Sequence, residues 1–205
     1  MKISTKQLKA VLKFAAKKDR RYYLEGIRVL VKAGNCHLIA TNGNTMFCGV
    51  FDLPEADKMF DCDIIISSDN VKTALKLAKK AKETEIALTF PSPEENMMAW
   101  WTLGATAFRP IDGTFPDVQR LINLARQKAN NPKEASNYNF DYLVDARDAL
   151  RLWDNTPKAN YALHQRGTDA ASMHAANGNA FVLIMPLRVD NADSIPVFHD
   201  VASSQ

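Results

Sequence analysis

Three segments of the chain carry apolar residues with the spacing of an amphipathic α-helix, and each begins near a residue that caps helices. The segments are residues 4–21, 67–83 and 139–155, with Ser4 or Thr5, Ser67 or Ser68, and Asn139 or Asp141 as candidate N-caps. Their apolar stripes consist of Leu8, Val11, Leu12 and Ala15; of Val71, Ala74, Leu75 and Ala78; and of Leu143, Ala146, Leu150 and Trp153. The pattern predicts three helices, each with one face on a core.

Shorter apolar runs bounded by Gly, Asn, Asp and Pro follow each predicted helix and are typical of strands. They span residues 22–34, 35–43 and 44–53, then 84–91, 95–104 and 106–111, and finally 159–167, 171–178 and 179–189. A β-α-β-β-β unit therefore appears three times, without strong residue identity between its copies. This predicts an α+β fold in which three equivalent units pack in a repeated manner.

One predicted hairpin departs from the alternation of a strand with one wet face. Residues 39–47 read IATNGNTMF, and the Asn-Gly step predicts a two-residue turn. Met46 and Phe47 are adjacent just after it, so one of the two side chains is expected on the core and the other on the wall of a site.

Composition places the chain among ordinary globular proteins. It has 205 residues, of which 46% are hydrophobic and 24% charged. No apolar run has the length of a membrane helix and the N-terminus has no signal-peptide pattern, so we expect a cytoplasmic protein with no membrane partner. Three cysteines without C-x-x-C spacing and four scattered histidines predict neither a disulfide framework nor a metal site, and no cofactor is expected.

Nothing in the sequence supports catalysis. There is no P-loop and no G-x-S-x-G motif. The carboxylate pairs Asp61/Asp63 and Asp145/Asp148 do not cluster with further metal ligands, and the first pair is interpreted as a solvated turn.

Charge is distributed unevenly. Residues 1–82 hold 16 Lys and Arg against 8 Asp and Glu, whereas the remainder is acidic. Lys6, Lys9, Lys13 and Lys17 share a face of the first helix, and Lys72, Lys76 and Lys79 share a face of the second. The rows fit either a surface for a polyanion or two solvated helix faces.

Four segments, in order and at matching spacing, resemble the bacterial sliding clamp, the beta subunit of DNA polymerase III. They are RYYLEG at 21–26, ATNG at 40–43, DGTFPD at 112–117 and IMPLRV at 184–189. Residues 1–122 are similar to the middle clamp domain, 123–137 read as a linker, 138–189 are similar to the second half of the last domain, and 190–205 form a tail.

The resemblance implies a clamp fold with helices on the inner face of antiparallel sheets, in a non-catalytic ring around duplex DNA. Sequence-independent contacts to phosphates suit mobile lysines. The residues expected to face DNA are Lys6, Lys9, Lys13, Lys17, Arg20, Lys72, Lys76, Lys79 and Lys80. The third helix mixes acidic and basic residues, so it is not assigned to DNA.

The family also binds short peptides of polymerases and clamp loaders between its middle and last domains. Carried over by position, the implied pocket consists of Leu24, Thr41, Gly43, Asn44, Thr45, Met46, Pro116, Arg120, Leu121, Tyr142, Leu183, Met185, Pro186, Leu187 and Arg188. Met46 is then a pocket wall and Phe47 faces the core. Asn44-Thr45 replaces the family's His-Arg, which removes a positive charge from the rim. The competing interpretation is that these apolar residues only pack the join between two sheets.

Clamp rings contain about twelve such units, so a three-unit chain predicts a homo-tetramer. Pairing of the lone third unit with its copy in a second chain would cover a sheet edge. An adaptor or decoy that binds replication proteins or a host clamp without encircling DNA is the alternative. The IPVF sequence at 195–198 loosely resembles a clamp-binding peptide, in a tail that is either disordered or folded back onto the pocket.

Overall fold

The computed structural model describes residues 1–58, 61–91, 100–127 and 137–187, without the side chains of 124–127. The first unit contains β1 (Lys2–Ser4), α1 (Thr5–Leu12), β2 (Gly26–Lys32), β3 (Asn35–Thr41) and β4 (Thr45–Asp52), with short 3-10 turns at Tyr22–Leu24 and Glu55–Asp57. The second contains β5 (Cys62–Ser67), α2 (Ser68–Ala81), β6 (Glu85–Thr89), β7 (Trp101–Leu103) and β8 (Thr106–Phe108). After α3 (Val118–Gln127), the third contains α4 (Phe140–Trp153), β9 (His164–Arg166), β10 (Asp169–His174) and β11 (Ala180–Ile184).

The first two units form one domain by exchanging their first strands. β1 of the first unit pairs with β6 of the second, and β5 of the second pairs with β2 of the first, both antiparallel. The two sheets therefore have the orders β1-β6-β7-β8 and β5-β2-β3-β4-β11-β10-β9. Neither of the first two units completes a sheet alone, so the two units form the domain together.

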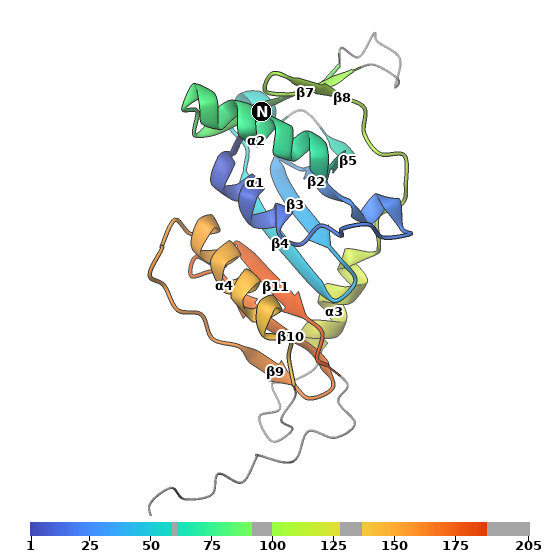
Figure 1. Ribbon diagram of the computed structural model, residues 1–205, viewed down its shortest axis with the longest axis vertical. Coiled ribbons are helices and arrows are strands. Elements are labelled where there is room, and N and C mark those ends of the chain that lie inside the picture. The colour runs from blue at the N-terminus through green and yellow to red at the C-terminus, as the bar shows by residue number, and fades with distance from the viewer. Residues whose placement is uncertain (59–60, 92–99, 128–136, 188–205) are drawn as a thin grey trace, which may run out of the picture.

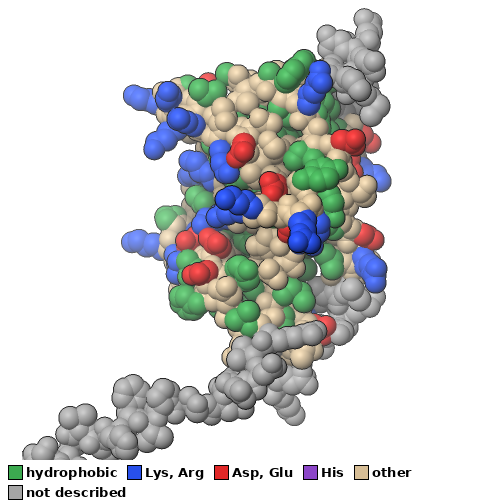
Figure 2. Space-filling view, turned by 45° about the vertical axis from the view of Figure 1, so that its right-hand side comes forward, with side chains coloured by type: hydrophobic (Ala, Val, Ile, Leu, Met, Phe, Trp, Pro, Cys, Tyr) green, Lys and Arg blue, Asp and Glu red, His purple; other side chains and the backbone are tan. Residues whose placement is uncertain are grey.

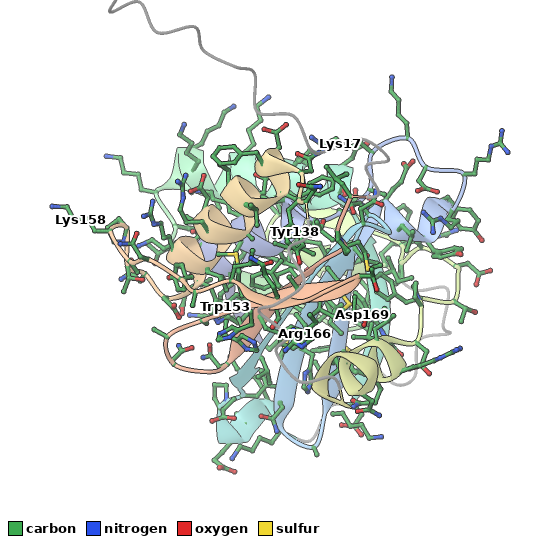
Figure 3. The ribbon with its side chains drawn as sticks, turned by 90° about the horizontal axis from the view of Figure 1, so that it is seen from below. Lys17, Tyr138, Trp153, Lys158, Arg166 and Asp169 are labelled. Carbon is green, nitrogen blue, oxygen red and sulfur yellow. The ribbon has the colours of Figure 1, made fainter. Side chains whose placement is uncertain are left out.

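The third unit continues the larger sheet, because β11 pairs antiparallel with β4 from Ala180 opposite Gly49 to Ile184 opposite Thr45. Trp153, at the end of α4, packs over this join. The centroid of its ring lies 5.3 Å from that of the Phe47 ring. The Trp153 indole N–H donates to Asn179 Oδ1 at 2.7 Å. Trp153 is labelled in Figure 3. A Cβ on Gly49 would lie 2.4 Å from the Trp153 ring, so only glycine fits beneath it.

Helices α1, α2 and α4 cover one face of the sheets, with α1 between the other two (Figure 1). Their capping follows the predicted N-termini: Ser4, Ser67 and Asn139 each accept a backbone N–H of the first turn. The predicted stripes are in the core, where Leu8, Val71 and Leu150 are buried. The opposite sheet face carries a second apolar cluster, in which Phe115 and Val118 pack on the strands. The predicted α+β arrangement, with helices on one face of antiparallel sheets, is thus observed.

Three details of the prediction are wrong. The first helix ends at Leu12 rather than near residue 21, because Phe14 turns into the core against Phe47 at 5.5 Å and the chain reverses through Lys18 at φ 56°. Helix α3 extends through residues 123–127, the start of the predicted linker, whose residues 128–136 lie outside the described part. In the described third unit, the first strand is reduced to a single bridge between Asn137 and Leu187.

Candidate functional site

A cavity of about 210 Å³ opens at the join between the first and third units. It lies on the sheet face opposite the helices, since Met46, Leu183 and Leu121 line it while Phe47 points into the helix-covered core. Its lining is completed by Thr41, Gly43, Asn44, Thr45, Asp169, Ala170 and Met185. The structure thus has Met46 on the wall of this cavity and Phe47 in the core.

The loop between β3 and β4 holds one end of the cavity rigid. Asn42 Oδ1 accepts the backbone N–H groups of Asn44 at 2.9 Å and Thr45 at 2.8 Å. Thr41 donates its hydroxyl to the Thr45 carbonyl at 2.7 Å, and the Met185 N–H donates to the Asn44 carbonyl at 2.8 Å. Because of this network the loop contains residues 42–44, one more than the predicted two-residue turn.

Not every residue carried over from the resemblance reaches the cavity. Leu24 is buried in the apolar cluster behind Met46, and Pro116 lines a separate groove under residues 114–122. Tyr142 contacts the rim only through its hydroxyl, 3.5 Å from Asn44 Nδ2. Arg120, Pro186 and Leu187 flank the lining, and Arg188 lies outside the described residues. Asp169 and Ala170 were missed because β10 reaches the cavity only through the β4–β11 pairing.

Arg21 places a positive charge near the rim of the cavity, although Asn44-Thr45 lacks the one that the resemblance implies. Its Nη2 lies 2.9 Å from where a Cβ of Gly43 would stand, and Gly43 has φ +89°. Arg21 is held by Asp19, with Nη2 2.8 Å from Oδ2 and Nε 3.0 Å from Oδ1. The side-chain hydrogen bonds from Arg21 lower the pKa of Asp19 to about 2. The guanidinium therefore remains paired and oriented over the loop.

The cavity has the properties of an anchor site for a linear peptide. Its walls are mostly apolar, with Thr, Asn and Asp side chains at the edge. Leu121 and Met185 are 41% and 46% exposed, so apolar surface stays open to a ligand. Methionines at two positions give an adaptable wall.

The helix-covered face carries the predicted lysines, but they differ between helices. On α2, Lys76, Lys79 and Lys80 are exposed and form no ion pair with any described residue, while Lys72 pairs with Asp69 at 3.0 Å. On the first unit, Lys13 donates to Asp145 of α4 at 2.8 Å and Lys6 to Asn155. Figure 2 shows Lys and Arg side chains gathered along one side of the molecule.

The remaining DNA candidates of the first unit are arranged differently from the prediction. Lys9 is exposed on α1, whereas Lys17 and Arg20 stand on the loop after it. The predicted four-lysine row on one helix is therefore wrong, because α1 is too short to hold it.

Metal ligands and reactive thiols are the remaining candidates for chemistry in the described part of the chain. No group of three or more His, Cys, Asp or Glu residues there could hold a metal ion. Burial raises the pKa of Cys36 and of Cys48 to about 12, so neither thiol is reactive. None of the described helices has the length and apolarity needed to cross a membrane.

No protein-family model and no curated protein sequence matches the chain. Solved structures of sliding clamps do. The Pseudomonas aeruginosa clamp matches with 17% identity and a TM-score of 0.62, the Thermotoga maritima beta subunit with 12% and 0.66, and the Caulobacter crescentus clamp with 14% and 0.67. Each match covers 92% of this chain. A Bartonella birtlesii clamp of the same fold, 18% identical with a TM-score of 0.63, was solved bound to griselimycin.

The chain therefore has the fold of the DNA polymerase III beta sliding clamps. It spans only 65–66% of the length of these solved clamp chains. The resemblance identified from four sequence segments is confirmed at the level of the fold.

Proposed function

We propose that this chain is the subunit of a DNA sliding clamp, a non-catalytic processivity factor that encircles duplex DNA and tethers replication proteins. One observation carries the proposal: within a clamp fold, a helix face with exposed lysines and an apolar cavity lie on opposite sides of the same sheets. The first would meet phosphates inside the ring and the second would hold partners outside it.

The exposed lysines of α2 support DNA as the ligand of the helix face. Lysine contacts phosphates without reading bases, which is what sliding requires. Lys13 donates to Asp145 of α4 and Lys6 to Asn155 just after that helix, so α2 is proposed as the main DNA-facing helix.

The cavity supports short peptides of polymerases and clamp loaders as partners. Its place at the join of two units and its apolar wall suit the aliphatic or aromatic side chains of an extended peptide. Griselimycin, seen on a clamp of the same fold, serves as a probe for this site.

Three units per chain support a ring of four chains with twelve units. The specific observation favouring the second candidate, an adaptor or decoy, is the third unit, whose described part does not complete a domain alone. Chains that stay as an open arc would bind replication proteins or another clamp but would not be held on DNA.

Retention on circular but not on linear DNA distinguishes a closed clamp from an adaptor or decoy. The protein is incubated with nicked circular plasmid, isolated by gel filtration at 0.2 M salt, and the plasmid is then cut once. A clamp remains on the circle and leaves the linear product. Equal retention on both forms would contradict encirclement.

Single-lysine variants test the inner face. Lys76→Ala is expected to lower the slope of log affinity against log salt by about 0.9, the value of one phosphate contact. Lys32→Ala is the matched control, because Lys32 is exposed on the opposite sheet face. Equal slopes for the two variants would contradict the assignment.

Griselimycin titration tests the cavity. Met185→Glu places a charge in the wall and is expected to weaken binding at least tenfold. Leu77→Glu is the control, since Leu77 is 38% exposed on α2 and is not among the residues that line the cavity. If both variants bind griselimycin like the unaltered chain, the cavity is not the peptide site.

A further inference from the structure

The described chain ends at the rim of the cavity between the first and third units. Met185 lines the cavity, and its backbone N–H donates to the Asn44 carbonyl at 2.8 Å. Two residues later, the Leu187 N–H donates to the Asn137 carbonyl at 2.7 Å, and Leu187 is the last described residue. These two hydrogen bonds hold the start of residues 188–205 close to the cavity wall.

The cavity keeps apolar surface exposed in the described structure. Leu121 and Met185 of its lining are 41% and 46% exposed, and Leu187 beside it is 46% exposed. Its volume of about 210 Å³ is below the roughly 300–1,000 Å³ of pockets that enclose drug-sized ligands. The cavity therefore suits a few apolar side chains of a short segment.

The sequence after Leu187 contains one apolar run of this kind. Within residues 188–205, four consecutive apolar residues occur only at 195–198, IPVF. Pro196 has no backbone N–H and a fixed φ, which disfavours both a helix interior and an inner strand for this run. Apolar side chains among polar neighbours gain free energy when a cavity removes them from water.

The run is close enough to reach the cavity. Eight residues separate Leu187 from Ile195. An extended chain covers about 3.3 Å per residue, so the run can lie anywhere within about 25 Å of Leu187. The cavity wall begins at Met185, well inside that distance. A tether of this length gives the run a local concentration of about millimolar at the cavity, which no free peptide of the same affinity matches at micromolar concentration.

Charge favours the same placement. Residues 189–205 contain three Asp and no Lys or Arg. Arg120 is exposed beside Leu121 on α3, and the Arg21 guanidinium lies next to Gly43 of the lining. Asp169 is the one acidic residue among the described lining residues. An acidic segment that enters the cavity therefore passes two guanidinium groups and one carboxylate.

We infer that residues 195–198 of this chain occupy its own cavity and compete there with the peptides of partner proteins. The bound run covers the exposed surface of Leu121 and Met185. A partner has to displace the run before it binds, so weak ligands are excluded and strong ones are admitted. The inference rests on the proposed function, because it gives the proposed peptide site a ligand within the chain itself.

Griselimycin affinity, measured by calorimetry on the full chain, tests the competition. Phe198→Asp removes the largest side chain of the run, and Val201→Asp makes the same change of charge outside it. A run that fills the cavity about nine-tenths of the time weakens the apparent affinity of a competitor about tenfold. Phe198→Asp is therefore expected to bind griselimycin about tenfold more tightly than the unaltered chain, and Val201→Asp is expected to bind it equally. Equal affinities for all three chains would overturn the inference.

Protease access measures the same contact without an added ligand. Chymotrypsin cleaves after Phe198, and mass spectrometry gives the rate of that one cut. Met185→Glu places a charge in the wall and releases the run, so the cut is expected to become about tenfold faster. Leu77→Glu adds the same charge on α2 and is expected to leave the rate unchanged. Equal rates for the unaltered chain and Met185→Glu would count against the inference.

A dilution series distinguishes the chain's own run from that of a second copy. A tethered run keeps its local concentration whatever the protein concentration is. The rate of the cut after Phe198 is therefore expected to be constant between about 1 and 100 μM protein. A rate that falls as the concentration rises would show that a second copy supplies the run, and occupation by the chain's own residues would be wrong.

The griselimycin and protease assays separate this inference from the proposed function. If no variant binds griselimycin but Met185→Glu still accelerates the cut, the proposed peptide site fails and occupation of the cavity by the run stands. If griselimycin binds the unaltered chain, Phe198→Asp and Val201→Asp equally, the peptide site stands and occupation by the run fails.

Discussion

The complete domain of the first two units and the lone third unit are built from the same elements, but they are stabilised differently. In the complete domain both sheets receive a strand from the opposite unit, and strand pairs such as Ile3–Ile86 and Ile66–Ile27 are fully buried. The third unit instead depends on one strand pairing with β4 and on the packing of α4. Each of the first two units therefore gives a strand to the other and receives one, whereas the third unit is attached to the first through a single strand pairing.

Trp153 gives the largest expected effect on this comparison. Trp153→Ala removes the ring that packs on Phe47 and should cost about 3–5 kcal/mol of unfolding free energy. Hydrogen exchange should show β10 and β11 opening while β2 and β3 stay protected. Leu8→Ala, in the complete domain, should lower protection of the whole domain instead, and identical exchange patterns for the two variants would contradict the distinction.

Gly49 gives the next effect. Gly49→Ala places a Cβ into the Trp153 ring and should destabilise the third unit by about 1–3 kcal/mol. In a Trp153→Leu background the same substitution should cost less, because the smaller side chain leaves room. A double-mutant cycle by urea unfolding measures this coupling, and additive costs would show that the two residues do not meet.

The N-caps of α4 and α2 allow the two regions to be compared directly. Asn139→Ala removes a hydrogen bond to the Asp141 N–H at 2.9 Å, and Ser67→Ala removes one to the Asn70 N–H at 3.2 Å. Each should cost about 1 kcal/mol. Loss of the Asn139 cap should lower protection from hydrogen exchange in the third unit, whereas loss of the Ser67 cap should lower protection in the domain of the first two units.

Acid should act weakly on both regions through one histidine each. Partial desolvation of the His174 ring, together with His164 and Arg166, lowers its pKa below 6.5, and partial burial with Arg28 lowers the pKa of His37. A lowered pKa favours the neutral form, so this stability is present above pH 6.5 and is lost as pH falls below it. His174→Gln should remove the acid-induced loss in the third unit, measured by hydrogen exchange at two pH values. His37→Gln should leave that loss intact.

The sequence predicted the starts of the three main helices and the order of the strands, because these depend on local periodicity and on turn residues. Met46 and Phe47 could be assigned to opposite faces from strand geometry. The end of α1 could not, since it is set by Phe14 packing on Phe47 from another strand. Asp169 and Arg21 were missed as site residues for the same reason: only the three-dimensional pairing of distant segments brings them to the cavity.

The strand exchange between the first two units also has a consequence for folding. β1, at the start of the described chain, pairs with β6, which follows α2. The smaller sheet therefore cannot form before β6 is available, and pairing strands so far apart in the sequence is slow. We expect the first two units to fold together in one cooperative step.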